Sequence, residues 1–260
     1  MLRVLRQGMS GSDVERWQHF LVGTGRSIIV TGAFDPQTMV ATRQFQAACC
    51  LADDGVVGPQ TLASAMHSGF DPTIDDSDDE FGPNWPPPPD GWVVPSLQQR
   101  ENDFGRFSYS PMPTLGNPEG IVIHGDWIAQ NIINVDVPQL KGVAYATSTK
   151  VPFNKRCASQ LQGVFAAWDS AGLIDRVLTW GGSFAPRFVR GSRTSLSNHA
   201  WGTAFDINVA WNMLGARPAL KGQKGSVREL VGIANEHGFA WGGHYLRRPD
   251  GMHFEVLKIQ

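Results

Sequence analysis

An acidic, proline-rich segment at residues 71–95 divides this chain of 260 residues. It holds seven acidic residues, no basic one, and seven of the 17 prolines, four of them consecutive. Like charges repel and consecutive prolines favour polyproline II, so we expect an extended, semi-rigid spacer. An ordered wrap over the larger domain, anchored by Trp85 and Trp92, is the alternative. The sequence therefore predicts one domain at residues 1–70, a linker at 71–95 and a second domain at 96–260.

The composition argues against several classes of protein. Hydrophobic residues make up 42% and charged residues 18%, which predicts a folded chain. The formal net charge of −2 argues against a nucleic-acid binder that works by bulk positive charge. No apolar run approaches the roughly 18 residues of a membrane span, so we expect no membrane insertion. Residues 96–260 hold 17 basic and 12 acidic residues, a net charge of +5 that would favour an anionic surface.

The start of the chain and its cysteines indicate how the protein reaches its target and whether it contains disulfides. Residues 1–6 lack the apolar core and the small-residue cleavage site of a secretory signal. We expect another route to the target, or a sequence that is incomplete at this end. Adjacent cysteines rarely bridge each other, so Cys49, Cys50 and Cys157 are expected to be reduced and structural.

The N-terminal domain contains an internal repeat, because residues 31–38 match residues 54–61 at a spacing of 23. In each copy a glycine turn precedes a helix start with proline at the first helical position, where its missing N–H costs nothing. An earlier helix is expected to open with Ser12 as N-cap and Glu15 as the partner of a capping box, and to end at Gly23. Its apolar face consists of Val14, Trp17 and Leu21. These patterns predict a small bundle of three helices.

This first domain resembles the peptidoglycan-binding repeat module of cell-wall hydrolases over roughly residues 3–68. The resemblance rests on a leading Gly-x-x-Gly-x-x-Val, on Gln18, and on two Gly-x-x-x-Pro-x-Thr elements around Phe45 and Gln46. It implies that peptidoglycan is the partner. A helper bundle with no ligand is the alternative.

Two histidines and one aspartate of the second domain have the chemistry of a catalytic zinc site. Zinc in such a site takes three imidazole or carboxylate ligands and leaves a fourth position for water. His199, Asp206 and His253 supply two neutral nitrogens and one anionic oxygen, and Gly202 allows the chain to turn back between the first two. The same ligands could hold iron or manganese. Zinc is favoured because three ligands plus water suit hydrolysis and no redox partner is visible.

Two alternating segments predict how these ligands could meet. Residues 204–209 alternate as in a strand, and Asp206 falls on the face opposite the large apolar side chains. Residues 252–256 alternate too, which puts His253 and Glu255 on one face. Neighbouring strands could therefore present His253 beside Asp206. With flanking helical stripes, the chain is predicted to be α+β: the three-helix bundle plus a larger domain whose mainly antiparallel sheet carries a zinc site and is flanked by helices.

Further polar residues are candidates for catalysis and substrate binding. Asp250 could carry a proton between the attacking water and the leaving amine, although a plain hairpin turn is the alternative reading of its loop. The guanidinium of Arg187 suits a substrate carboxylate or carbonyl. Arg190 and Arg193 compete for that role, and a solvated basic loop is the alternative for all three. His244 lies in an aromatic, glycine-rich loop that could line the substrate cleft.

The whole pattern resembles the zinc peptidase family of D-alanyl-D-alanine carboxypeptidases and L-alanyl-D-glutamate endopeptidases, over roughly residues 140–257. The family motif Ser-x-His-x-x-Gly-x-Ala-x-Asp is complete here in Ser197, His199, Gly202, Ala204 and Asp206. The second motif, an acid three residues before a histidine, is met by Asp250 and His253. The resemblance does not assign a role to residues 96–140.

The resemblance implies a role for each matched residue. It implies that His199, Asp206 and His253 bind Zn²⁺ and that Asp250 is the general acid/base. It also implies an arginine that stabilises the substrate carbonyl or carboxylate, for which Arg187 is the best match. The remaining candidate substrate-binding residues are Ser197, Arg190 and His244.

We therefore expect a monomeric zinc-dependent hydrolase of peptidoglycan stem peptides that is tethered to the cell wall by its first domain. Whether it acts as a carboxypeptidase or an endopeptidase stays open. A catalytically inactive, zinc-containing wall-binding protein is the alternative, although the presence of Asp250 argues against it. By analogy alone, the arrangement is that of a phage endolysin, which leaves the cytoplasm through a pore made by another protein.

Overall fold

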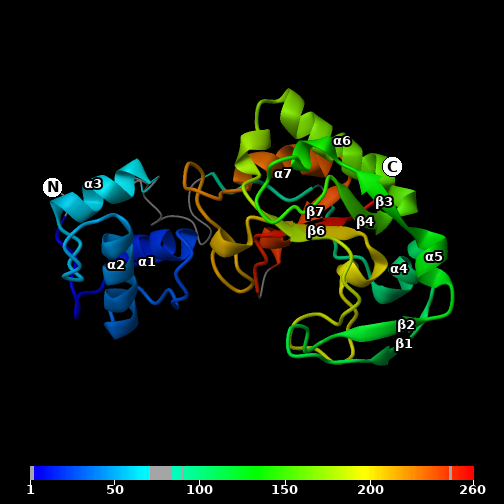
Figure 1. The fold of residues 1–260 in the computed structure, drawn as a ribbon, viewed down its shortest axis with the longest axis horizontal. Coiled ribbons are helices and arrows are strands. Elements are labelled where there is room, and N and C mark those ends of the chain that lie inside the picture. Colours follow the sequence, from blue (N-terminus) through cyan, green and yellow to red (C-terminus); the bar gives the residue numbers. More distant parts are fainter. Residues whose placement is uncertain (1–2, 69, 71–83, 90, 246–247) are drawn as a thin grey trace. The chain divides into compact units, whose positions relative to one another are not determined.

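The computed structural model describes residues 3–68, 70, 84–89, 91–245 and 248–260, and Figure 1 shows their fold. The chain forms two compact units that do not follow its linear order. The first consists of Met1–Pro86, Asn208–Glu229 and Gly243–Met252, and the second of Pro87–Ile207, Leu230–Gly242 and His253–Gln260. Helices and antiparallel strands are both present, which confirms the predicted α+β class. The acidic run of the predicted linker lies outside the described residues, and the domain boundaries stay a prediction.

Three helices form near the N-terminus, as the repeat predicts: α1 (Ser12–Gly23), α2 (Pro36–Ala48) and α3 (Pro59–His67). Pro36 and Pro59 are the first residues of their helices. Asp35 caps α2, because its carboxylate accepts a hydrogen bond of 2.7 Å from the backbone N–H of Thr38.

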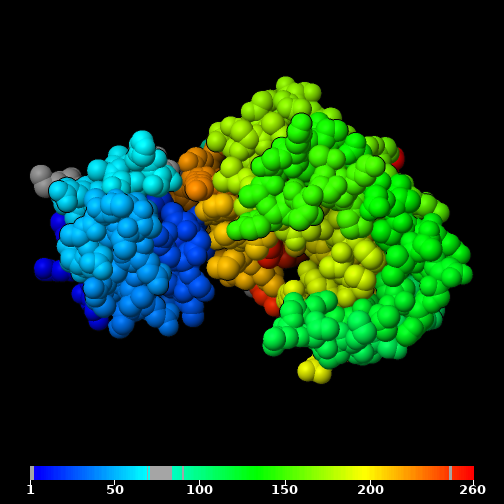
Figure 2. All heavy atoms as spheres, viewed as in Figure 1, coloured from blue at the N-terminus to red at the C-terminus, as the bar shows by residue number. Residues whose placement is uncertain are grey.

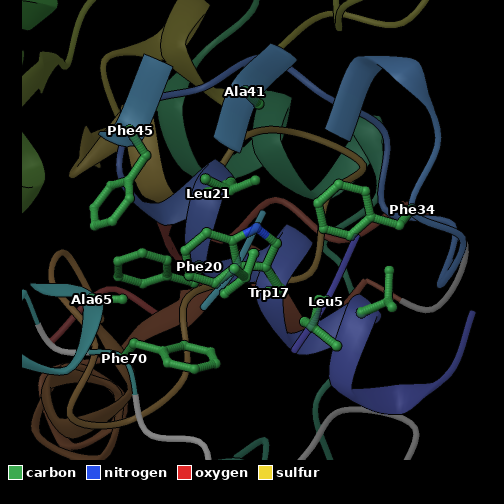
Figure 3. Packing of buried hydrophobic residues seen from close by; sticks show 11 residues of the cluster. Leu5, Trp17, Phe20, Leu21, Phe34, Ala41, Phe45, Ala65 and Phe70 are labelled. Atoms are coloured by element: carbon green, nitrogen blue, oxygen red, sulfur yellow. The ribbon is translucent and has the colours of Figure 1, made fainter. Parts of the chain in front are cut away.

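Aromatic rings fill the core of this bundle (Figure 3). Trp17 lies edge-on to Phe45 and Phe70, with ring centroids 5.7 and 5.6 Å apart. Phe20 lies 5.2 Å from each of the same two rings. Such pairs add to the free energy gained by burying the rings, so the apolar face predicted for the first helix is the core face.

Each glycine turn of the repeat is held by one buried glutamine. The amide oxygen of Gln18 accepts hydrogen bonds of 2.9 Å from the backbone N–H groups of Thr31 and Gly32, and its amide nitrogen donates to Ala33 and Thr38. Gln46 does the same for the second turn. Its partners are Gly55 N–H, the carbonyl of Val56, Thr61 Oγ1 and Asp54 Oδ1.

The predicted capping box of the first helix is wrong. Gly11, with φ of 144°, is the N-cap, and no side chain caps this end. The Gly11 N–H donates to the carbonyl of Gly32, which fixes the chain one residue before Ser12. Glu15 instead lies 3.8 Å from His19 on the next turn. A long-range backbone contact therefore decides where this helix begins.

The second unit is built on a four-stranded antiparallel sheet with the strand order β5-β6-β8-β7. These strands are β5 (Trp180–Gly182), β6 (Ala204–Ile207), β8 (His253–Val256) and β7 (Phe239–Trp241). Helix α6 (Ala158–Ser170) lies over the sheet (Figure 1), and Phe165 and Trp168 pack against Phe205 at 5.5 and 6.1 Å. Helix α7 (Arg228–Glu236) joins it, since Trp168 donates a hydrogen bond to the Leu230 carbonyl.

The segment before α6 adds short elements around this sheet. They are α4 (Leu97–Phe104), β1 (Ser108–Pro111), β2 (Ile121–His124), α5 (Trp127–Asn131), β3 (Ile132–Asp136) and β4 (Lys150–Asn154). Strands β1 and β2 pair with each other, as do β3 and β4. Two tryptophans hold the end of α4, because Trp127 and Trp201 donate to the carbonyls of Phe104 and Gly105.

Trp85, at the end of the predicted linker, packs against the protein. Its ring lies 5.1 Å from the guanidinium carbon of Arg228 and 5.8 Å from the ring of His244. Nε2 of His244 lies 2.8 Å from the carbonyl oxygen of Pro86. Trp85 and Pro86, near the end of the predicted linker, are therefore in contact with Arg228 and His244, as an ordered wrap anchored by Trp85 would be.

The three cysteines form no disulfide, as predicted. Burial raises the pKa of the Cys157 thiol to about 12, so this side chain behaves as a small apolar group. Among the described residues, no helix combines the length and the hydropathy needed to cross a membrane.

Candidate metal centre

Two central strands place Asp206 and His253 side by side. In the antiparallel pair of β6 and β8, Asp206 is directly opposite His253, and Ala204 is opposite Glu255. Alternate residues point to opposite faces of a strand, so the polar side chains share one face. The other face is apolar, where the rings of Phe205 and Phe254 stack at 5.4 Å. This register confirms the predicted meeting of the two segments.

The third residue of the cluster, His199, comes from a tight turn before β6. It lies in the 3₁₀ turn η4 (Asn198–Trp201), which ends at Gly202 in the left-handed conformation, with φ of 64°. A Cβ at Gly202 would lie 3.2 Å from the backbone nitrogen of Asn154, which is tighter than most Cβ contacts, and 2.7 Å from Cδ1 of Ile132. Glycine therefore meets both a conformational and a steric requirement, and it lets the chain return from His199 to Asp206.

Three ligand-type atoms converge at this place. Nε2 of His199 lies 3.2 Å from Oδ1 of Asp206 and 3.1 Å from Nδ1 of His253, and the last two atoms are 3.0 Å apart. Bonds of about 2.0–2.1 Å at tetrahedral angles put zinc ligands roughly 3.3 Å apart, so one such ion fits the triangle. His199, Asp206 and His253 would hold the ion, and with three protein ligands it would have a fourth position for water.

Both imidazoles have a second partner on the side away from the cluster. Nδ1 of His199 lies 2.6 Å from the carbonyl oxygen of Ser183, which can only accept. Nε2 of His253 lies 3.4 Å from a carboxylate oxygen of Glu255. We assign the ring protons to these outer nitrogens, which leaves both lone pairs directed at the cluster.

The carboxylate of Asp206 stays ionised in this place. Burial alone would raise its pKa, but without a metal, protonated imidazoles of His199 and His253 donate hydrogen bonds to it and outweigh burial, which holds the pKa well below its ordinary value. The neutral form with both lone pairs directed at the cluster is the form that would bind a cation. An ionised carboxylate between two imidazoles is a ready set of ligands for a divalent cation. Binding of the cation would displace any proton shared among the three.

Two of the predicted substrate residues lie close to the His199 turn. Ser197 is buried, and its hydroxyl oxygen accepts a hydrogen bond of 3.4 Å from the backbone N–H of His199, so it caps the turn. Its own N–H donates to the carbonyl of Arg187 at 3.0 Å. The half-buried Arg187 therefore lies in the segment next to the turn that carries His199.

The other predicted residues have different surroundings. Arg190 pairs with Glu119 at 2.6 Å and lowers the pKa of that carboxyl, while Arg193 is exposed. His244 contacts the carbonyl oxygen of Pro86 and the ring of Trp85.

Asp250 is half-buried in the loop that leads into β8. That loop is held at both ends, because Pro249 accepts a hydrogen bond from Gly215, and Met252 donates one to Asn212. The functional roles of these residues stay predictions.

The motifs in the sequence do not identify the partners that orient the imidazoles. The alternation of residues 252–256 predicts that Glu255 shares a face with His253, but it assigns Glu255 no role. Ser183 contributes through its backbone and left no signal in the sequence. Arg100, which lies 3.8 Å from Glu255, comes from the segment that the family likeness did not place.

Comparison with known proteins finds two family matches in this chain. Residues 190–256 match the family of D-alanyl-D-alanine carboxypeptidases. Residues 10–64 match the family of putative peptidoglycan binding domains. Both resemblances predicted from the motifs are thereby confirmed, over shorter stretches than predicted. The first match contains all three residues of the cluster.

A curated relative points in the same direction. The zinc D-Ala-D-Ala carboxypeptidase of Streptomyces albus G is 40% identical to this chain over 61 residues. The matched part is 22% of this chain and 24% of that protein, so the chain spans about a quarter of the length of this relative.

Proposed function

We propose that this protein is a zinc peptidase that hydrolyses peptide bonds in the stem peptides of peptidoglycan at the bacterial cell wall. The observation that carries the proposal is the triangle of His199 Nε2, Asp206 Oδ1 and His253 Nδ1, with sides of 3.0 to 3.2 Å. Two imidazoles and one carboxylate form a ligand set of the kind that catalytic zinc takes. The family match over residues 190–256 and the name of the curated relative support zinc and a peptidoglycan peptide as substrate.

Each of the other candidate residues would have a role of its own in binding or catalysis. When bound, zinc lowers the pKa of a coordinated water to about 7 and polarises a carbonyl oxygen. Asp250 would take a proton from the attacking water and return one to the leaving amine. Arg187 would bind a substrate carboxylate or carbonyl through its guanidinium, and its segment bonds to Ser197 beside the His199 turn. Ser197, Arg190 and His244 are the further candidates for substrate contacts.

The helical module would keep the enzyme at its substrate. Its match to the putative peptidoglycan binding domains supports peptidoglycan as the partner of residues 10–64. Tethering raises the local concentration of cleavable bonds and needs no new contact in the active site. A tethered enzyme suits an insoluble polymer, so we favour an endopeptidase that cuts intact peptidoglycan over a carboxypeptidase that trims its ends.

Digestion of purified peptidoglycan tests the proposal. The full chain loaded with zinc should release fragments, and mass spectrometry should identify a single new N-terminal residue, or a released terminal amino acid for a carboxypeptidase. Metal analysis of the same sample should find stoichiometric zinc. Bound zinc without cleavage would favour the inactive wall-binding alternative, and absence of both would overturn the proposal.

A further inference from the structure

A buried carboxylate lies directly behind His253. Glu255 has no exposed surface, although it is an acid on a strand of the central sheet. Its Oε2 lies 3.4 Å from Nε2 of His253 and 3.8 Å from Nη2 of Arg100. An ionised carboxylate away from water is costly unless hydrogen bonds or opposite charge compensate it. The imidazole N–H and the guanidinium both face Oε2 and supply such compensation.

We propose that Glu255 and Arg100 are positioning residues that prepare the His253 imidazole for metal binding, an inference that rests on the proposed zinc site. A neutral imidazole has one nitrogen with a proton and one with a lone pair, and only the second can bind a metal. Glu255 accepts the proton-bearing side, Nε2–H. The lone pair of Nδ1 then faces Asp206 and His199 at 3.0 and 3.1 Å.

Arg100 acts on His253 through Glu255. Its side chain is 14% exposed and comes from α4, which is remote from β8 in the sequence. The guanidinium offsets the charge of Glu255, and its nearest carboxylate oxygen is the one that faces the imidazole. The segment that the family likeness did not place would thus contribute to the metal centre.

The two imidazoles differ in how they are oriented. His199 donates to a neutral backbone carbonyl, that of Ser183, at 2.6 Å. No side-chain substitution removes that acceptor. His253 relies on two side chains, and a carboxylate partner also makes an imidazole a stronger ligand. Zinc affinity should therefore depend on residues 255 and 100.

Zinc affinity of the full chain tests this, measured by competition with a chromophoric chelator. Glu255→Gln keeps the shape of the side chain and removes its charge, and it should weaken zinc binding roughly 10- to 100-fold. Arg100→Met should weaken binding less. Because Arg100 acts through Glu255, the double variant should bind zinc as Glu255→Gln does, and the two effects should not add.

Glu101→Gln is the matched control on the same helix. Glu101 pairs with Arg106 at 3.0 Å near the surface, and neither residue belongs to the chain of contacts that leads to His253. This variant removes a carboxylate of the same kind, and its zinc affinity should stay within about twofold of the unaltered protein. Thermal melting of each zinc-free variant reports whether the fold is intact.

The outcomes separate this inference from the proposed function. A folded Glu255→Gln that binds zinc with unchanged affinity overturns the role of Glu255. Additive losses in the double variant overturn the action of Arg100 through Glu255. If Glu255→Gln does not fold, Arg100→Met decides, because unchanged affinity there overturns the inference and a loss supports it. An unaltered protein that binds no zinc overturns the proposed function itself.

Discussion

The helical module and the central sheet both bury polar side chains, but they satisfy them in opposite ways. In the module, the amide of Gln18 has an acceptor or a donor for each of its four hydrogen-bonding positions. In the sheet, His199 and His253 use one ring nitrogen each on an outer partner and turn the other toward Asp206. The first arrangement is complete without a ligand. The second brings lone pairs together and is complete only with a cation or a shared proton.

This difference explains what each kind of buried polar group does. A saturated amide fixes a turn, so its loss should lower the stability of the fold and leave chemistry unaffected. Converging lone pairs repel one another, so the fold holds them together in spite of their interaction. Such a cluster supports the proposed metal site. Figure 2 shows the same two regions with all heavy atoms, the helical module in blue and the strands of the second unit among the yellow to red segments.

The largest effect is expected from loss of a ligand. His199→Ala or His253→Ala leaves two ligands of the triangle, which is too few to hold the ion, so both zinc and peptidase activity should disappear. Metal analysis and peptidoglycan digestion measure the two losses. Either variant with stoichiometric zinc would show that the cluster is not the metal site.

A large effect on turnover alone is expected from Asp250→Ala. The residue is proposed to move protons and not to bind the metal, so kcat should fall by about 10²- to 10⁴-fold. Zinc content should stay unchanged. Loss of metal from this variant would make Asp250 a ligand and refute the role assigned to it.

In the helical module, loss of a buried polar side chain should lower stability and leave zinc binding unchanged. Gln18→Ala or Gln46→Ala leaves several buried backbone groups of one turn without a partner, which should cost about 2–3 kcal/mol of stability. Hydrogen exchange of amides in residues 3–68 of the full chain measures this loss. Zinc affinity should be unchanged, and a fall in it would mean that the two regions are coupled.

The smallest effect is expected at the cap of α2. Asp35→Ala removes the hydrogen bond to the Thr38 N–H and should cost about 1 kcal/mol at neutral pH. That backbone hydrogen bond is also the main reason that the pKa of Asp35 lies below its ordinary value. A depressed pKa means that the stabilisation is complete above the unfolded value near 4 and is lost as the pH falls through the folded value.

The direction of this pH dependence can be tested by unfolding Asp35→Ala and the unaltered chain at pH 7 and at about pH 2.5. The difference between the two proteins should shrink at the acid end. A difference that is constant or grows toward low pH would show that the charged carboxylate does not supply the stabilisation.

The sequence predicted the elements whose signals are local. Proline after a glycine turn placed the starts of α2 and α3, and strict alternation placed Asp206 and His253 on the polar faces of two strands. It failed at α1, where the pattern from Ser12 to Glu15 looks like a capping box. Instead, Gly11 is the N-cap, because its N–H donates a hydrogen bond to the carbonyl of Gly32, which is remote in the sequence.

By itself, the sequence determined which residues could form a metal centre, because ligand chemistry and the period of a strand belong to a few neighbouring residues. Only the tertiary structure decided that Asp206 lies opposite His253, that Ser183 and Glu255 orient the two imidazoles, and that Arg100 reaches Glu255 from α4. These contacts join segments that are remote along the chain. They are set by how the sheet and helices pack, and no short stretch of sequence contains that information.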